Sequence, residues 1–91
     1  MRKRTTTVTP TGDVQRVLTE LIKVAEDLLE VSDISADSNL FEAGGDSLTA
    51  AEMVCVIEER VGIAIPIDLA FDARSFRELA IAIVQQSVRA Q

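Results

Sequence analysis

The spacing of apolar residues between Val14 and Leu29 constrains the fold of this chain more than any other feature. Apolar side chains occur there at positions 14, 17, 18, 21, 22, 25, 28 and 29. Steps of three and four residues place these side chains on one face of an α-helix. The spacing therefore predicts a first helix over residues 14–29, with Thr11 or Asp13 capping its start and Pro10 just before it.

The segment after Gly45 has the signals of a second helix. Asp46 or Ser47 suits its start, and Gly62 follows an expected end near Arg60. One apolar stripe of this helix is predicted to face the core, and it comprises Ala50, Met53, Val54, Ile57 and Val61. A second apolar stripe of Leu48, Ala51 and Cys55 lies on another side and is expected to be largely exposed. The acidic residues Glu52 and Glu59 lie beside it.

Two more helices are expected in the last third of the chain. Pro66 keeps the preceding residue extended and permits a short helical turn from about Ile67 to Phe71. Ser75 and Glu78 have the spacing of a capping box, in which each side chain bonds the free amide of the other residue. The last helix continues from there with apolar residues at helical spacing, namely Phe76, Leu79, Ala80, Ile83 and Val84.

These elements predict an all-α fold, a small four-helix bundle of three main helices and one short helix. A long loop over residues 31–45 joins the first two helices, and its apolar residues Ile34, Leu40 and Phe41 are expected to anchor it to the core. Core positions are predicted for three large side chains, namely Met53, Ile57 and Phe76.

The length of 91 residues, with 47% hydrophobic and 26% charged residues, predicts one soluble domain with a modest core. Residues 1–10, which include Arg2, Lys3 and Arg4, are interpreted as a solvated basic arm, and residues 11–91 as the domain. We expect a monomer, because a single small bundle shows no long heptad seam.

Composition excludes several classes of function. With no histidine and one cysteine, the chain cannot build a Ser-His-Asp or Cys-His arrangement or an ordinary Cys/His zinc site, so neither catalytic nor metal-binding residues are expected. A net charge of −6 and the absence of Trp and Tyr argue against nucleic-acid binding. No apolar run approaches the roughly 20 residues of a membrane span. The lone cysteine forbids an internal disulfide and fits a cytoplasmic location.

Gly44, Gly45, Asp46, Ser47 and Leu48 form the most informative motif, where the long loop meets the second helix. Two glycines permit positive φ and close approach by another surface. Asp46 is a natural N-cap, and Ser47 follows it at the positive end of the helix dipole, where a phosphate is favoured. The same letters also suit a helix start with no other role.

A second interpretation treats Gly45 to Leu48 (GDSL) as a hydrolase signature with Ser47 as nucleophile. Such a serine needs a base, and the chain contains no histidine. No strand precedes the motif, as a strand-turn-helix nucleophile site would require. This interpretation is therefore disfavoured.

The motif and its surroundings resemble the phosphopantetheine-dependent carrier proteins of fatty-acid, polyketide and nonribosomal peptide synthesis. The resemblance covers about residues 12–88 and depends on the helix order and on three segments, which are LFEAGGDSL (40–48), Ile65-Pro66 and FRELA (76–80). It implies that Ser47 is the attachment point for 4′-phosphopantetheine, transferred from coenzyme A by a separate phosphopantetheinyl transferase.

The resemblance further implies that the protein is a carrier and not an enzyme. The attached arm would hold an acyl or aminoacyl group as a thioester and deliver it to partner enzymes. Gly44 and Gly45 match the family's turn, and Asp46 matches the aspartate that helps to position the motif for the transferase and its magnesium ion. A cap alone remains an equally good account of Asp46.

The exposed stripe of the second helix matches the recognition helix of these carriers. Leu48, Ala51 and Cys55 would make a small apolar contact, while Glu52 and Glu59 would meet basic residues on partner enzymes. The charge supports such partners, because residues 5–91 hold six basic and fifteen acidic residues, a net charge of −9. An ordinary solvated face would show the same pattern.

The cargo and the pathway follow from finer features of the resemblance. The two consecutive glycines before Asp46 are more similar to peptidyl carriers, whereas the acidity also suits acyl carriers of fatty-acid or polyketide synthesis. With its own Met1, the chain is interpreted as a discrete peptidyl carrier of a bacterial secondary pathway, loaded by an adenylating or acyltransferase enzyme, and a domain excised from a larger synthase is the alternative. An unmodified acidic helical protein that only binds partners is the remaining alternative.

Overall fold

The computed structural model describes the backbone of residues 10–89 and the side chains of residues 14–86. It contains four helices, α1 (Pro10–Leu29), α2 (Ser47–Val61), α3 (Ile67–Asp72) and α4 (Phe76–Arg89), and no strand within residues 10–89. This confirms the predicted bundle of three main helices and one short helix. The interpretation of a solvated arm falls almost wholly on residues 1–9, which lie outside the described residues.

The start of α1 differs from the sequence prediction. The helix begins at Pro10, so Thr11 and Asp13 lie inside its first turn and neither precedes it as a cap. Proline suits this position because the first-turn amides have no partner within the helix, and because its fixed φ is already helical. The remainder of the predicted helix, including its end at Leu29, is confirmed.

Both ends of α2 and the start of α3 agree with the prediction. Asp46 is the N-cap of α2, and Gly62 closes its other end with φ 72°, donating its amide to the Glu58 carbonyl at 2.9 Å. The Glu58 carboxylate also accepts a 2.8 Å bond from the Ile65 amide, which holds the connection to α3. Pro66 then precedes α3, whose short span is confirmed.

The capping box of α4 is confirmed in one half only. The Ser75 hydroxyl accepts a 3.0 Å bond from the Glu78 amide, as predicted. The Glu78 carboxylate, however, accepts from the amide of Arg74 at 2.9 Å, one residue before the expected partner. Loop carbonyls accept from the first two amides of α4, because Phe76 donates to Ser38 and Arg77 to Ala36, each at 2.9 Å.

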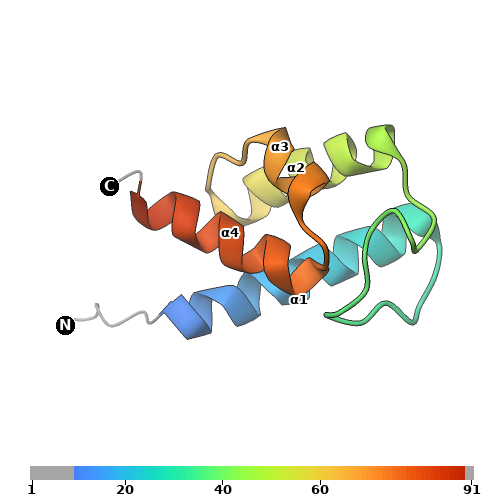
Figure 1. Cartoon of the computed structure of the whole chain (residues 1–91), viewed down its shortest axis with the longest axis horizontal. Coiled ribbons are helices and arrows are strands. Elements are labelled where there is room, and N and C mark those ends of the chain that lie inside the picture. The colour runs from blue at the N-terminus through green and yellow to red at the C-terminus, as the bar shows by residue number, and fades with distance from the viewer. Residues whose placement is uncertain (1–9, 90–91) are drawn as a thin grey trace.

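Helix α1 packs against α2 and α4, and the short α3 contacts both α2 and α4 (Figure 1). The three predicted core residues Met53, Ile57 and Phe76 are at most 1% exposed. Val61, also predicted to face the core, is half-buried against it. No helix within residues 10–89 is both long enough and apolar enough to cross a bilayer.

The loop between α1 and α2 folds back over the bundle and reaches the start of α4 (Figure 1). Leu40 is buried in the core and Ile34 is half-buried against it, as predicted. Phe41 is not a core anchor: its ring is exposed and stacks on the exposed ring of Phe71 in α3, with centroids 6.1 Å apart.

Candidate functional site

A compact turn over residues 39–45 leads directly into α2. The amide of Ala43 donates to the Asn39 carbonyl at 2.9 Å, and the amide of Gly45 donates to the Leu40 carbonyl at 2.9 Å. A third bond of 3.2 Å joins the Gly44 amide to the Phe41 carbonyl. Because backbone bonds close this turn, they set the direction in which the chain enters α2.

The two glycines of the turn are required for different reasons. Gly44 has φ +113°, a conformation that side-chain-bearing residues rarely adopt, although the space around it is open. There is no space for a side chain at Gly45, because a Cβ there would lie 2.9 Å from Leu40 Cγ, 3.0 Å from its Cδ1 and 3.0 Å from its carbonyl oxygen. Gly44 therefore permits the bend, and Gly45 permits the turn to lie directly on Leu40.

Asp46 caps α2 through one carboxylate oxygen. Its Oδ1 accepts 3.0 Å bonds from both the amide and the hydroxyl of Thr49. The backbone bond from Thr49, followed by the side-chain bond from the same residue, lowers the pKa of Asp46 below its usual value. The side chain is therefore a carboxylate at neutral pH, and it places a negative charge at the positive end of the helix.

Ser47 is the first residue of α2, and its side chain is exposed. The adjacent Leu48 is 68% exposed, so the side chains at the start of the helix are open to solvent. A serine here can receive a bulky group without displacing the core. The chain contains no histidine, so no histidine lies beside Ser47 to act as a base. These features suit covalent attachment of a phosphopantetheine arm by a separate enzyme.

The predicted partner face lies on the solvent side of α2. Its members Leu48, Ala51, Glu52, Cys55 and Glu59 are all exposed. They share the helix with buried Ala50, Met53, Val54 and Ile57, so the division of α2 into a core stripe and an exposed stripe is confirmed. Cys55 is a free thiol on this face. Because Ser47 begins the same helix, the face lies alongside the candidate attachment point.

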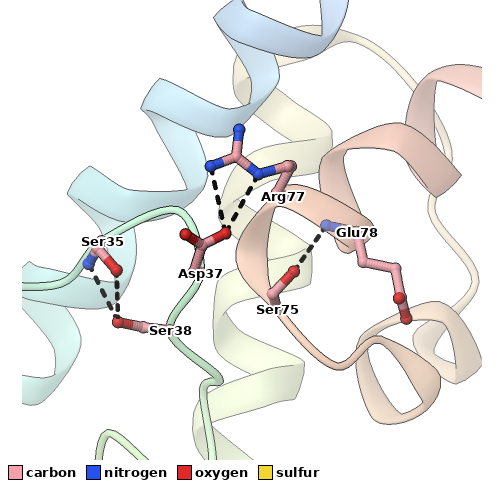
Figure 2. A network of polar contacts seen from close by, with 6 residues as sticks. All are labelled: Ser35, Asp37, Ser38, Ser75, Arg77 and Glu78. Atoms are coloured by element: carbon pink, nitrogen blue, oxygen red, sulfur yellow. Dashed lines mark hydrogen bonds and ion pairs between the residues drawn. The ribbon is translucent and has the colours of Figure 1, made fainter.

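Sequence reasoning missed the side-chain contacts between the loop and the α3–α4 region. Figure 2 shows Asp37 of the loop receiving bonds of 3.3 and 3.2 Å from the Arg77 guanidinium at the start of α4. Asn39 makes a second connection, because its Nδ2 donates to the carbonyls of Ala73 and Arg74. An Asn within a Ser/Asp-rich stretch is typical of a turn, but that signal does not reveal a partner 35 residues away.

Comparisons with known proteins agree with this geometry. Residues 16–83, well over half of the chain, match the family described as a phosphopantetheine attachment site. The chain is 37% identical over 65 residues to phosphinothricin tripeptide synthetase PhsB of Streptomyces viridochromogenes and 30% identical over 73 residues to gramicidin S synthase 2 of Brevibacillus brevis. It is also 32% identical over 60 residues to bacitracin synthase 1 of Bacillus licheniformis.

These alignments cover 71%, 80% and 66% of this chain but only 6%, 2% and 1% of the three synthetases. No solved structure matches the chain significantly. The family match spans α2 and its preceding turn together with most of α1 and α4. The chain therefore belongs to the phosphopantetheine attachment site family, whose members carry substrates on a covalently bound 4′-phosphopantetheine arm.

Proposed function

We propose that this protein carries aminoacyl or peptidyl intermediates in nonribosomal peptide biosynthesis, on a phosphopantetheine arm attached to Ser47. One observation carries the assignment of the residue: Ser47 is the exposed first residue of α2, directly after the glycine turn, inside the segment that matches the family. The peptide pathway is supported by the relatives, whose names describe a tripeptide synthetase, gramicidin S synthase 2 and bacitracin synthase 1.

The modification requires a bond from Ser47 Oγ to the phosphorus on the pantetheine side of the coenzyme A diphosphate. The bond from that phosphorus to the bridging oxygen breaks, and adenosine 3′,5′-bisphosphate leaves with the electron pair. The hydroxyl proton passes to a base of the transferase. The carrier contributes an exposed hydroxyl on a rigid helix start, so the chain itself performs no catalysis in this proposal.

Asp46 has two roles in this proposal. Its Oδ1 accepts bonds from the amide and the hydroxyl of Thr49, and its lowered pKa means that the carboxyl is ionised at neutral pH. An ionised carboxylate next to Ser47 repels a phosphate but attracts a divalent cation. We therefore assign Asp46 both the capping of α2 and an approach to the magnesium ion of the transferase.

The partners proposed are a phosphopantetheinyl transferase, an adenylating or acyltransferase loading enzyme and downstream synthase domains. Leu48 and Ala51 offer these partners a small apolar surface, and Glu52 and Glu59 surround it with negative charge. Charge of one sign along a helix steers a partner of opposite charge and increases its rate of association. The free thiol of Cys55 on the same face fits a reducing compartment such as the cytoplasm.

Intact-protein mass spectrometry tests the proposal. The chain is incubated with coenzyme A and a broad-specificity phosphopantetheinyl transferase, with Ser47→Ala as the matched control. We expect one phosphopantetheinyl group on the wild type and none on the variant. An unmodified, folded wild type, in a reaction that modifies another carrier in parallel, would support the unmodified interaction protein instead. Loading of the holo chain by an amino-acid-adenylating enzyme then tests the cargo.

A further inference from the structure

Asn39 bonds two separate parts of the chain with one side chain. Its Oδ1 accepts from the amides of Phe41 at 2.8 Å and Glu42 at 3.1 Å, which begins the turn before α2. Its Nδ2 donates to the carbonyls of Ala73 at 3.4 Å and Arg74 at 3.2 Å, in the connection between α3 and α4. Both ends of the amide are therefore in use.

The backbone before Asn39 is fixed to the same region. The Ser38 carbonyl accepts from the Phe76 amide and the Ala36 carbonyl accepts from the Arg77 amide, each at 2.9 Å. Asn39 thus extends a line of bonds that joins the loop to the start of α4. Asn39 is also the first residue of the turn over residues 39–45, so this line of bonds meets the turn at Asn39.

The turn transmits the position of Asn39 to the attachment site. The Asn39 carbonyl accepts from Ala43, and the neighbouring Leu40 carbonyl accepts from Gly45. The Gly45 amide bonds the Leu40 carbonyl, and a Cβ at Gly45 would meet Leu40 at 2.9–3.0 Å, so the end of the turn packs directly on its beginning. Asp46 and Ser47 follow directly and start α2.

We propose that Asn39 is a positioning residue for the modification of Ser47. Its Oδ1 shapes the turn, and its Nδ2 tethers that turn to the connection between α3 and α4. Asn39 acts through the backbone and does not contact the transferred phosphate. The inference rests on the proposed attachment at Ser47, because it concerns the orientation of that hydroxyl in the transferase complex. Misplacing a reacting group by about 1 Å can lower a rate by about a hundredfold.

The test measures steady-state phosphopantetheinyl transfer to four full-length proteins, which are the wild type, Asn39→Ala, Asn39→Asp and Asp37→Ala. Asn39→Ala removes both parts of the interaction. Asn39→Asp keeps an acceptor for the turn amides but loses the donor to Ala73 and Arg74. Asp37→Ala is the matched control, because it removes the side-chain bonds from the loop to the Arg77 guanidinium and leaves Asn39 and the backbone bond from Arg77 to Ala36 in place. Thermal unfolding of each protein gives the midpoint relative to the assay temperature.

We expect the kcat of the transferase to fall about tenfold or more with Asn39→Ala as its substrate, and by a smaller factor with Asn39→Asp. The KM for each variant should stay within about twofold of the value for the wild type, because the exposed face of α2 is unchanged. The control should keep the wild-type kcat. A kcat for Asn39→Ala equal to that of the control overturns the inference, as does a loss that only follows the unfolded fraction. If Asn39→Ala does not fold, a wild-type kcat for Asn39→Asp overturns it. An unmodified wild type contradicts the proposed function instead.

Discussion

Replacing Gly45 with alanine tests whether the turn before the attachment site depends on close contact with Leu40. The new Cβ would lie 2.9 Å from Leu40 Cγ, 3.0 Å from Cδ1 and 3.0 Å from the carbonyl oxygen. Leu40 is only 6% exposed, so moving its side chain away from the new Cβ would disturb buried packing. Overpacking of this kind costs about 1–3 kcal/mol of unfolding free energy. For a domain of this size, each kcal/mol lowers Tm by about 4–8 °C.

A double-mutant cycle isolates the contact. Leu40→Ala alone removes a buried side chain and should cost about 2–5 kcal/mol. It also removes Cγ and Cδ1, the side-chain atoms that the alanine at position 45 would meet. The double mutant should therefore lose less unfolding free energy than the two single mutants lose together. We expect a coupling free energy of about 0.5–3 kcal/mol between residues in contact. The relief is incomplete because the Leu40 carbonyl stays in place.

Urea unfolding followed by circular dichroism at 25 °C measures the cycle, with Gly44→Ala as the matched control. Gly44 has open space around it, so alanine there is destabilising because of its φ of +113° and not because of Leu40. Leu40→Ala should therefore relieve Gly45→Ala and leave the cost of Gly44→Ala unchanged. Additive free energies at position 45, or equal coupling at both glycines, would refute the contact as the reason for Gly45.

Three further predictions concern the start and the exposed face of α2. Ser47→Ala should unfold within about 0.5 kcal/mol of wild type in the same urea assay, because Asp46 and not Ser47 caps the helix; a larger loss would mean that the hydroxyl has a structural role. Glu52→Lys or Glu59→Lys should slow association with a basic partner enzyme in stopped-flow measurements, most clearly at low salt, and unchanged rates at low salt would contradict electrostatic steering. Thr49→Val should raise the pKa of the Asp46 carboxyl toward its usual value in an NMR titration, since the Thr49 hydroxyl bond is one cause of the lowering. If the pKa of Asp46 is the same in Thr49→Val as in wild type, the backbone bond from Thr49 is the cause of the lowering. Because the pKa of Asp46 is lowered on folding, the carboxylate stabilises the fold above its unfolded pKa of about 3.8. That contribution is lost as the pH falls through the folded pKa.

Local chemistry determined much of this protein in advance. Asp46 and Gly62 mark the ends of α2 because caps act within a few residues of the helix that they close. The division of α2 into buried and exposed stripes follows from helical spacing alone. Ser47 is proposed as the attachment point from the same short motif, and it lies within the residues that match the phosphopantetheine attachment site family.

Tertiary structure decided the features that depend on residues distant in the sequence. Phe41 stacks on Phe71 instead of entering the core, and Asn39 bonds Ala73 and Arg74 about 35 residues away. The reason for a glycine at position 45 also depends on tertiary structure, because it is the Leu40 side chain and carbonyl that leave no space for a Cβ there. Spacing rules describe which face of one helix is apolar, whereas these contacts depend on how the loop and the α3–α4 connection meet, so only the folded chain could show how the start of α2 is held.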